Sequence, residues 1–173
     1  MTSPTGRLVG VDDGVYRLRA PANLVSKRAV LHWTLSAAIG WVVALGALAG
    51  WWAFAGHAWQ GPALAALGGV AVLHTAVMPT WRYRVHRWET TPEAVFTRSG
   101  WVSQQWRLAP VSRIQTVDTQ RGPLQQALNL ATVTVTTASA AGPVKIEGLD
   151  TDVAARIVDE LSATTQAVPG DAT

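Results

Sequence analysis

The chain contains one long apolar stretch that is free of charged side chains. No Asp, Glu, Lys or Arg occurs from Ala29 to Trp81, and Gly, His and Pro interrupt this stretch near its middle, at residues 56–62. A membrane-spanning helix needs about 20 mostly apolar residues, so the stretch has room for two helices and a turn. The pattern predicts a transmembrane hairpin with spans at about 31–55 and 62–78.

After this stretch the hydrophobic residues recur at every second position, which is typical of half-buried strands. Val95 with Thr97, and Trp106 with Leu108, show this spacing. Turns containing Gly or Pro separate the alternating segments, and one helical turn is expected at 124–128. The predicted strands are 82–90, 93–99, 103–110, 113–120, 131–138 and 143–148.

The last predicted element is an amphipathic helix. Val153, Ile157 and Leu161 fall on one face of it, and Asp150 or Thr151 can cap its start. A single helix of this kind after a run of strands must bury its apolar face against them. We therefore expect a small β-barrel or bent sandwich that is closed by a C-terminal helix.

These elements divide the chain into four segments. Residues 1–23 are expected to be flexible or interfacial, and 24–81 contain the two transmembrane helices. Residues 82–166 form one small β-rich domain, and 167–173 form a disordered tail.

Basic residues next to the spans predict the orientation of the hairpin. These basic residues lie just before the first span and just after the second span. The connection between the two spans has no Lys or Arg. By the positive-inside rule, both termini are expected in the cytoplasm, with the chain crossing the inner (plasma) membrane twice. The same residues are candidate contacts for lipid headgroups, namely Lys27, Arg28, Arg82, Arg84 and Arg87.

Two interpretations of these basic residues stay open. They act only as a topology signal, or they also bind anionic membrane lipids. Alternate residues of a strand leave on one face, so a strand at 82–90 would point Arg82 and Arg84 together toward the bilayer.

The overall charge gives no indication of a nucleic-acid partner. The formal net charge is +3, but from residue 82 onward nine Lys or Arg residues are balanced by nine Asp or Glu residues. The excess positive charge therefore lies before the first span, where membrane lipids are the expected partners.

The sequence shows no pattern that is typical of an enzyme. It has no cysteine, and its four histidines lack carboxylates at metal-ligand spacing. It also has no glycine-rich phosphate loop and no nucleophile motif. We expect a non-enzymatic protein with no catalytic residue, no metal site and no cofactor.

Small residues recur at a spacing of four in both predicted spans. Such residues let helix backbones approach closely in a membrane. They either pack the two spans against each other, or they mediate self-association or docking to another membrane protein. The candidate helix-packing residues are Gly46, Gly50, Gly61, Ala65 and Gly69.

The segment 113–124 combines polar residues with apolar ones and a Gly-Pro turn. In one interpretation its polar side chains form a binding face for a partner. In the other they are the solvated edge of a strand whose apolar residues are core. The candidate partner-binding residues are Arg113, Gln115, Asp118, Gln120 and Arg121.

The order of several short motifs resembles the bacterial pleckstrin-homology (PH) domain of the YdbS-like membrane proteins. The resemblance implies a PH-like fold, and two spans ahead of such a domain are also the layout of that family. It implies no reaction. One departure is Asn129, where the family favours Gly, although Asn tolerates a left-handed backbone. The matching motifs are Arg113-Ile114-Gln115, Gln120-Arg121-Gly122-Pro123-Leu124, Leu130-Ala131, Thr136-Thr137-Ala138 and Ile146-Glu147-Gly148-Leu149.

Together these observations favour a membrane-anchored PH-like binding or scaffold module that acts through protein partners. The resemblance suggests a larger membrane protein with several such domains as one partner. Two alternatives are a lipid-surface sensor in envelope stress or resistance to membrane-active peptides, and an accessory subunit of a membrane transport complex.

Overall fold

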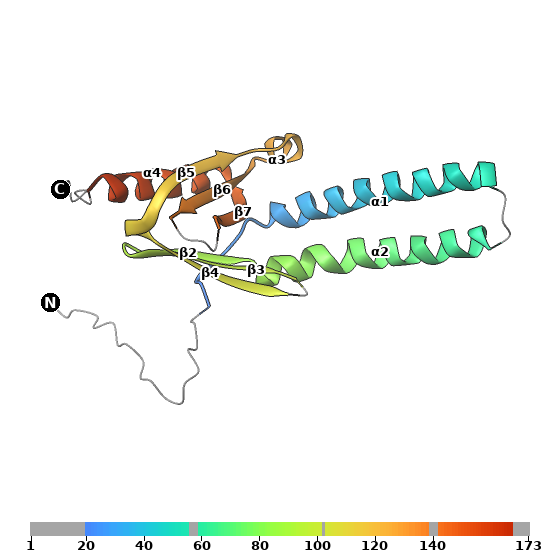
Figure 1. The fold of residues 1–173 in the computed structure, drawn as a ribbon, viewed down its shortest axis with the longest axis horizontal. Helices are drawn as coiled ribbons and strands as arrows, with labels where there is room; N and C mark the ends of the chain where they lie inside the picture. Colours follow the sequence, from blue (N-terminus) through green and yellow to red (C-terminus); the bar gives the residue numbers. More distant parts are fainter. Residues whose placement is uncertain (1–19, 56–58, 102, 139–141, 168–173) are drawn as a thin grey trace, which may run out of the picture.

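Two long helices project from one end of a β-rich domain in the computed structural model (Figure 1). The structure describes residues 20–55, 59–101, 103–138 and 142–167. Most of the predicted flexible segment, residues 56–58 of the predicted turn between the spans and nearly all of the predicted tail therefore lie outside the described residues.

The two long helices are α1 (Arg28–Ala55) and α2 (Gln60–Val85), which lie side by side. Both are long and apolar enough to cross a membrane. In the most apolar 18-residue stretch of each helix, the share of buried residues is 0% for α1 and 6% for α2. Phe54 of α1 is 94% exposed. Apolar surface of this extent is stable in lipid and costly in water, so the predicted transmembrane hairpin is confirmed.

Helix α2 extends further toward the domain than the sequence pattern predicts. It continues through Pro79 to Val85, and β2 (Arg87–Thr90) begins after His86. Arg82 and Arg84 lie in its last turn, where positive charge interacts favourably with the negative end of the helix dipole. The prediction of a strand from residue 82 is therefore wrong over its first five residues.

Because residues 82–85 are helical, Arg82 and Arg84 point in different directions. Residues two positions apart in a helix are rotated by about 200°, so their side chains point to different sides. Arg82 is half-buried and faces the domain, whereas Arg84 is exposed. The expectation that both point together toward the bilayer is wrong.

The domain consists of two antiparallel sheets, as the period-two pattern predicts. Each of the five strands expected after residue 92 is found within two residues of its predicted bounds. The first sheet has the order β1 (Asn23–Leu24), β2, β3 (Ala94–Gly100) and β4 (Gln104–Pro110). The second has the order β5 (Ile114–Gln120), β6 (Leu130–Thr137) and β7 (Val144–Asp150).

The connections between these strands are short. A 3-10 turn, η1 (Val111–Arg113), joins the two sheets, and the expected helical turn is α3 (Pro123–Ala127). Asn129 follows it with a φ of 53°, the left-handed conformation that Asn tolerates. Among the described residues no ladder of hydrogen bonds links the two sheets. Of the two folds expected from the sequence, the domain is therefore the bent sandwich and not the closed barrel.

The C-terminal helix α4 (Thr151–Ala167) covers the second sheet, as expected. Its Ala154, Ile157 and Leu161 are each no more than 2% exposed. They pack into one apolar core with both sheets. The other core residues are Val95, Ala109, Val111, Ile114, Ala131, Val133, Val135, Val144, Ile146 and Leu149.

Strand β4 has the expected period of two, and its large apolar side chains lie on the exposed face. Trp106 and Leu108 are 38% and 52% exposed, on the outer face of the first sheet. Val95 of β3 pairs with Ala109, which is in the core, so Arg107 and Gln105 lie on the inner face with Ala109. Burial of Ala109 decides the register, and hydrophobicity of the strand alone does not reveal this.

The small residues of the spans do not pack the hairpin together. A Cβ atom added at Gly46, Gly50 or Gly69 would meet nothing within 4 Å, and Ala65 is exposed. Only Gly61 approaches the other helix, at 3.4 Å from the Trp52 side chain. Packing within the hairpin is therefore wrong as an explanation of this spacing, because most of these residues face the surroundings.

The β-rich domain is attached directly to the hairpin. The Ser26 backbone N–H donates to the Gly148 carbonyl at 2.9 Å, and the Ser26 hydroxyl donates to Asp150 at 2.8 Å. Gly148 has a φ of +76°, and a Cβ there would lie 2.6 Å from the Cβ of Ala29. Only a glycine lets β7 approach the start of α1 this closely.

Burial of α4 leads to a stability prediction. Ile157→Ala removes a side chain that is 2% exposed, so we expect a loss of about 2 to 5 kcal/mol in unfolding free energy. Glu160→Ala on the exposed side of the same helix should change it by no more than about 0.5 kcal/mol. Thermal unfolding of the full chain in a mild detergent measures both, and equal effects would contradict the packing of α4.

Candidate functional site

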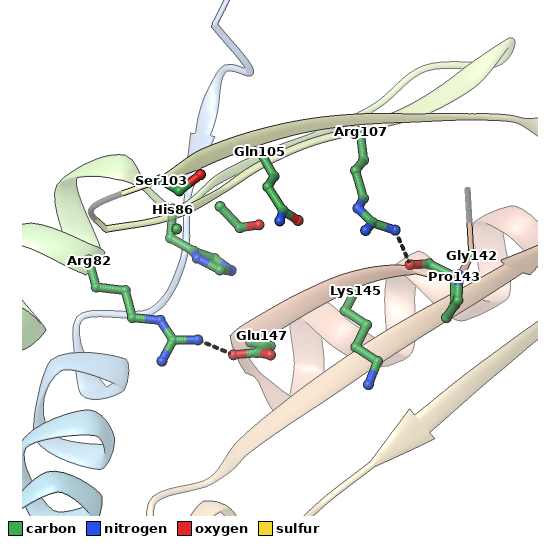
Figure 2. A pocket seen from close by; sticks show the side chains of 11 residues that line it. Arg82, His86, Ser103, Gln105, Arg107, Gly142, Pro143, Lys145 and Glu147 are labelled. Atoms are coloured by element: carbon green, nitrogen blue, oxygen red, sulfur yellow. Dashed lines mark hydrogen bonds and ion pairs between the residues drawn. The ribbon is translucent and has the colours of Figure 1, made fainter. Parts of the chain in front are cut away.

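A polar cleft lies where the two sheets meet the end of α2 (Figure 2). Its volume is about 470 Å³. Side chains from α2, β3, β4 and β7 converge on it, although these elements are far apart in the sequence. The lining residues are Arg82, His86, Ser99, Gly100, Ser103, Gln105, Arg107, Gly142, Pro143, Lys145 and Glu147.

Arg82 connects three elements at the membrane end of this cleft. Its guanidinium lies 4.5 Å from the ring centroid of Trp33 on α1, a cation–π contact. It also forms an ion pair with Glu147 on β7 (Figure 2). Because both side chains are about one third exposed, the pair is only partly desolvated.

His86 lies at the base of the cleft and is only 3% exposed. Its ring packs against Trp33 with centroids 5.6 Å apart, and its Nδ1 has no hydrogen-bond partner among the described residues. Burial lowers the pKa of His86 to about 4, and the Arg82 charge adds to this effect while Glu147 opposes it. His86 is therefore neutral at pH 7.

Two further cations line the cleft. Arg107 reaches from β4 toward β7 and donates to the Pro143 carbonyl at 3.0 Å (Figure 2). Lys145 is exposed on β7. With Arg82 and a single carboxylate, Glu147, the lining residues have a net charge of +2 when His86 is neutral. The arrangement suits a small anion.

The tip of the β3–β4 hairpin places one end of the cleft at the membrane. The Trp81 indole donates to the Trp101 carbonyl at 2.8 Å, and the Trp101 ring lies 5.7 Å from that of His74. His74 and Trp81 are about 10 Å apart along α2. The tip therefore runs back along the span, and Trp81 and Trp101 are suited to the headgroup region.

The tip is tight at Gly100. This residue has a φ of +116°, and a Cβ there would clash with the Ser103 carbonyl oxygen. The close approach places Ser99, Gly100 and Ser103 together at the membrane end of the cleft. The glycine is required for that arrangement.

The structure separates the five predicted lipid contacts. Only Arg82 lines the cleft, while Arg84 is exposed and Arg87 lies half-buried on β2. Lys27 and Arg28 share a different hollow, of about 770 Å³, at the start of α1. In that hollow Arg28 lies 3.9 Å from an Asp150 oxygen.

The predicted partner-binding residues lie along one edge of the domain. Arg113, Gln115, Asp118 and Gln120 are exposed on η1 and β5. Arg121 instead donates from Nε to the Leu130 carbonyl at 3.2 Å, and it also lines the hollow at the start of α1. The structure thus groups four of the five residues, three on β5 and Arg113 on the 3-10 turn that precedes it.

Sequence reasoning missed His86, Ser103, Arg107 and Lys145 as site residues. Their one local signal is the spacing of two in Gln105 with Arg107 and in Lys145 with Glu147, which is typical of polar residues on one strand face. The approach of β4 to β7, which belong to different sheets, has no local signal in the sequence.

A transmembrane hairpin that precedes two antiparallel sheets and a closing helix defines a class of membrane-anchored PH-like proteins. Residues 30–165 match the family described as Bacterial PH domain, and the chain belongs to this family. This finding confirms the resemblance stated from the sequence motifs.

One curated relative matches the chain. The chain is 32% identical over 92 residues to the UPF0699 transmembrane protein YdbS of Bacillus subtilis (strain 168). The match covers 53% of the chain and 57% of that protein, so it spans little more than half of the relative's length. No solved structure matches the chain at a significant level. The family match and the transmembrane relative together show that the protein is a membrane-associated module.

Arg82 gives the first prediction for this region. Arg82→Ala removes the contact with Trp33 and leaves Glu147 without its ion pair, so we expect a loss of on the order of 1 to 3 kcal/mol in unfolding free energy. Arg84→Ala, on the same helical turn but exposed, should cost no more than about 0.5 kcal/mol. Thermal unfolding in detergent compares the two, and an Arg84→Ala loss as large as that of Arg82→Ala would refute the role of Arg82.

The low pKa of His86 predicts how the stability of the protein depends on pH. Its pKa is 6.5 when unfolded and about 4 when folded, so the unfolded chain takes up a proton first as the pH falls. The stability due to neutral His86 is present above pH 6.5 and is lost toward pH 4, by on the order of 2 to 4 kcal/mol. His86→Phe should flatten the decline between pH 7 and 5 in thermal unfolding. An unchanged slope would show that His86 is not held neutral.

Proposed function

We propose that the chain is a non-enzymatic, membrane-anchored binding module that brings protein partners to the cytoplasmic face of the inner membrane. The family and the two spans support the membrane-associated part of this proposal. The cytoplasmic orientation is supported by Lys27, Arg28, Arg82 and Arg84, which lie at the domain ends of the spans.

The observation that best supports a protein partner is the exposed edge of β5. Among the described strands, β5 pairs only with β6, so its other side has unpaired backbone groups. Six of its residues, Gln115 to Gln120, are exposed or half-buried, and Asp118 is their only charged residue. An edge strand with so little charge is suited to accept a strand from another chain.

The direct attachment of the domain strengthens this interpretation. Only His86 separates α2 from β2, and Ser26 ties the start of α1 to β7. The β5 edge is therefore held in a fixed orientation to the membrane instead of at the end of a flexible linker. A fixed edge lowers the entropy cost of docking a partner that is itself in the membrane.

The absence of cysteine from the chain allows a sharp experiment. Single cysteines introduced as Gln115→Cys and Gln120→Cys lie on β5, and Glu160→Cys lies on the exposed face of α4 as the matched control. In intact cells we expect all three to react with a membrane-permeant maleimide and none with an impermeant one, as for a cytoplasmic domain.

A photo-crosslinking maleimide on the same cysteines tests the partner surface. We expect a discrete crosslinked protein from both β5 positions and none from Glu160→Cys. The same adduct from all three positions, or none from β5, would reject β5 as the partner surface. Labelling by the impermeant reagent would reject the cytoplasmic orientation.

A further inference from the structure

We propose that the outer face of the first sheet binds the phosphate group of an anionic membrane lipid, with Arg87 and Arg98 as its charged ligands. The tip of the β3–β4 hairpin then lies inserted in the headgroup layer of the membrane. This surface goes beyond the protein-binding function proposed above, and it belongs to a different sheet from β5. It depends only on the membrane anchoring of the chain.

Two arginines lie side by side on this outer face. Arg87 of β2 pairs with Arg98 of β3, so their Cβ atoms are about 4.5 to 5.5 Å apart. The next pair along the two strands, Trp88 with Thr97, is on the inner face. Like charges directly opposite each other in a sheet are destabilising. The arginine pair is therefore unfavourable unless an anion lies between the two guanidinium groups.

Among the residues that the structure describes, no carboxylate forms an ion pair with either of these arginines. Glu89 lies two positions further along β2 on the same face, and it accepts a hydrogen bond from the Ala22 backbone N–H at 3.0 Å. Phosphate groups bind through several charge-assisted hydrogen bonds, and two neighbouring guanidinium groups supply them. A phosphate is therefore a ligand that fits this pair.

The side chain of Arg98 is held in place before any ligand binds. Its guanidinium lies 5.0 Å from the ring centroid of Trp106. Its Nε and Nη2 donate to the Gln104 side-chain oxygen at 3.2 and 2.6 Å. A cation that is already held in place loses little side-chain entropy when it binds an anion.

The tip of the hairpin places this face near the lipid headgroups. The Trp101 ring lies 5.7 Å from that of His74 within the second span, and the Trp101 carbonyl accepts a hydrogen bond from Trp81. Figure 1 shows this end of β3 and β4 beside the domain end of α2. Arg98 precedes Trp101 by three residues, which is about 10 Å along a strand. Because an arginine side chain can extend back toward the bilayer, its guanidinium reaches the headgroup layer.

Exposed apolar side chains flank the two arginines. Trp106 lies opposite Arg98 and Leu24 lies opposite Arg87, and both apolar side chains are exposed. Trp101 and Trp81 are exposed as well and continue this surface to the lipid-facing part of α2. Tryptophan beside arginine is typical of the membrane interface. This continuity with the spans favours a membrane lipid as the source of the phosphate.

Thermal unfolding of the full chain tests the phosphate site. The protein is kept in mixed micelles of a neutral detergent with phosphatidylcholine, which is replaced stepwise by phosphatidylglycerol. A ligand that binds only the folded state raises the unfolding temperature. We expect phosphatidylglycerol to raise it and phosphatidylcholine, which has no net charge, to have little effect.

Arg87→Gln gives the decisive comparison. In phosphatidylcholine it removes the repulsion of Arg98, so the unfolding temperature should stay unchanged or rise. In phosphatidylglycerol the variant should unfold below the wild-type temperature, and half-maximal stabilisation should need about ten times more of this lipid. Arg113→Gln is the matched control, because Arg113 is exposed and follows the other end of β4. It should show neither effect.

The insertion of the tip is tested with single cysteines, since the chain has none of its own. Ser103→Cys places a bimane label at the exposed tip, and Glu93→Cys places one at the opposite end of β3 as the control. With the protein reconstituted in vesicles, a lipid that carries a nitroxide on its headgroup should quench the label at Ser103→Cys several-fold more strongly.

Each part of the proposal can fail separately. An Arg87→Gln shift that is the same in both lipids, or an equal effect of Arg113→Gln, would overturn phosphate binding by the arginine pair. Equal quenching at the two cysteines would overturn the insertion of the tip. If soluble glycerol phosphate stabilises the chain as much as phosphatidylglycerol does, the assignment to a lipid is wrong. None of these results depends on crosslinking at β5.

Discussion

The contact of Arg82 with Trp33 and Glu147 is the interaction on which the arrangement of this protein depends. It joins α1, α2 and β7 at the point where the membrane hairpin becomes the PH-like domain. The guanidinium satisfies the one carboxylate of the cleft and covers an indole face at the same time. Without this contact, Glu147 would be a partly buried charge without a partner beside the bilayer.

The direct attachment explains why a polar cleft persists in so small a domain. The inner face of β3 and β4 is apolar at Val95 and Ala109 but polar at Ser99, Gln105 and Arg107, toward the membrane. The core with α4 stabilises the apolar end. The polar end is held by the hairpin tip, which contacts α2 through Trp81 and Trp101.

The two proposed surfaces lie on separate parts of the domain. The β5 edge belongs to the second sheet, while the arginine pair of β2 and β3 lies on the outer face of the first sheet. Because the domain is tied to both spans, a partner docked at β5 would be held in a fixed orientation to the membrane helices. The outward-facing Gly46, Gly50 and Gly69 add a surface in the membrane that the hairpin itself does not use.

The sequence by itself determined the features that depend on local pattern. The uncharged stretch from Ala29 to Trp81 can only be stable as membrane helices, and the period-two and period-3.6 patterns set the strands and α4. The motif order also identified the family. Tertiary structure alone decided which face of β4 is buried, that α2 continues to Val85, and that residues of α2, β4 and β7 line one cleft. These features depend on strand register and on contacts between segments that are distant in the sequence. A local sequence pattern contains no information about either.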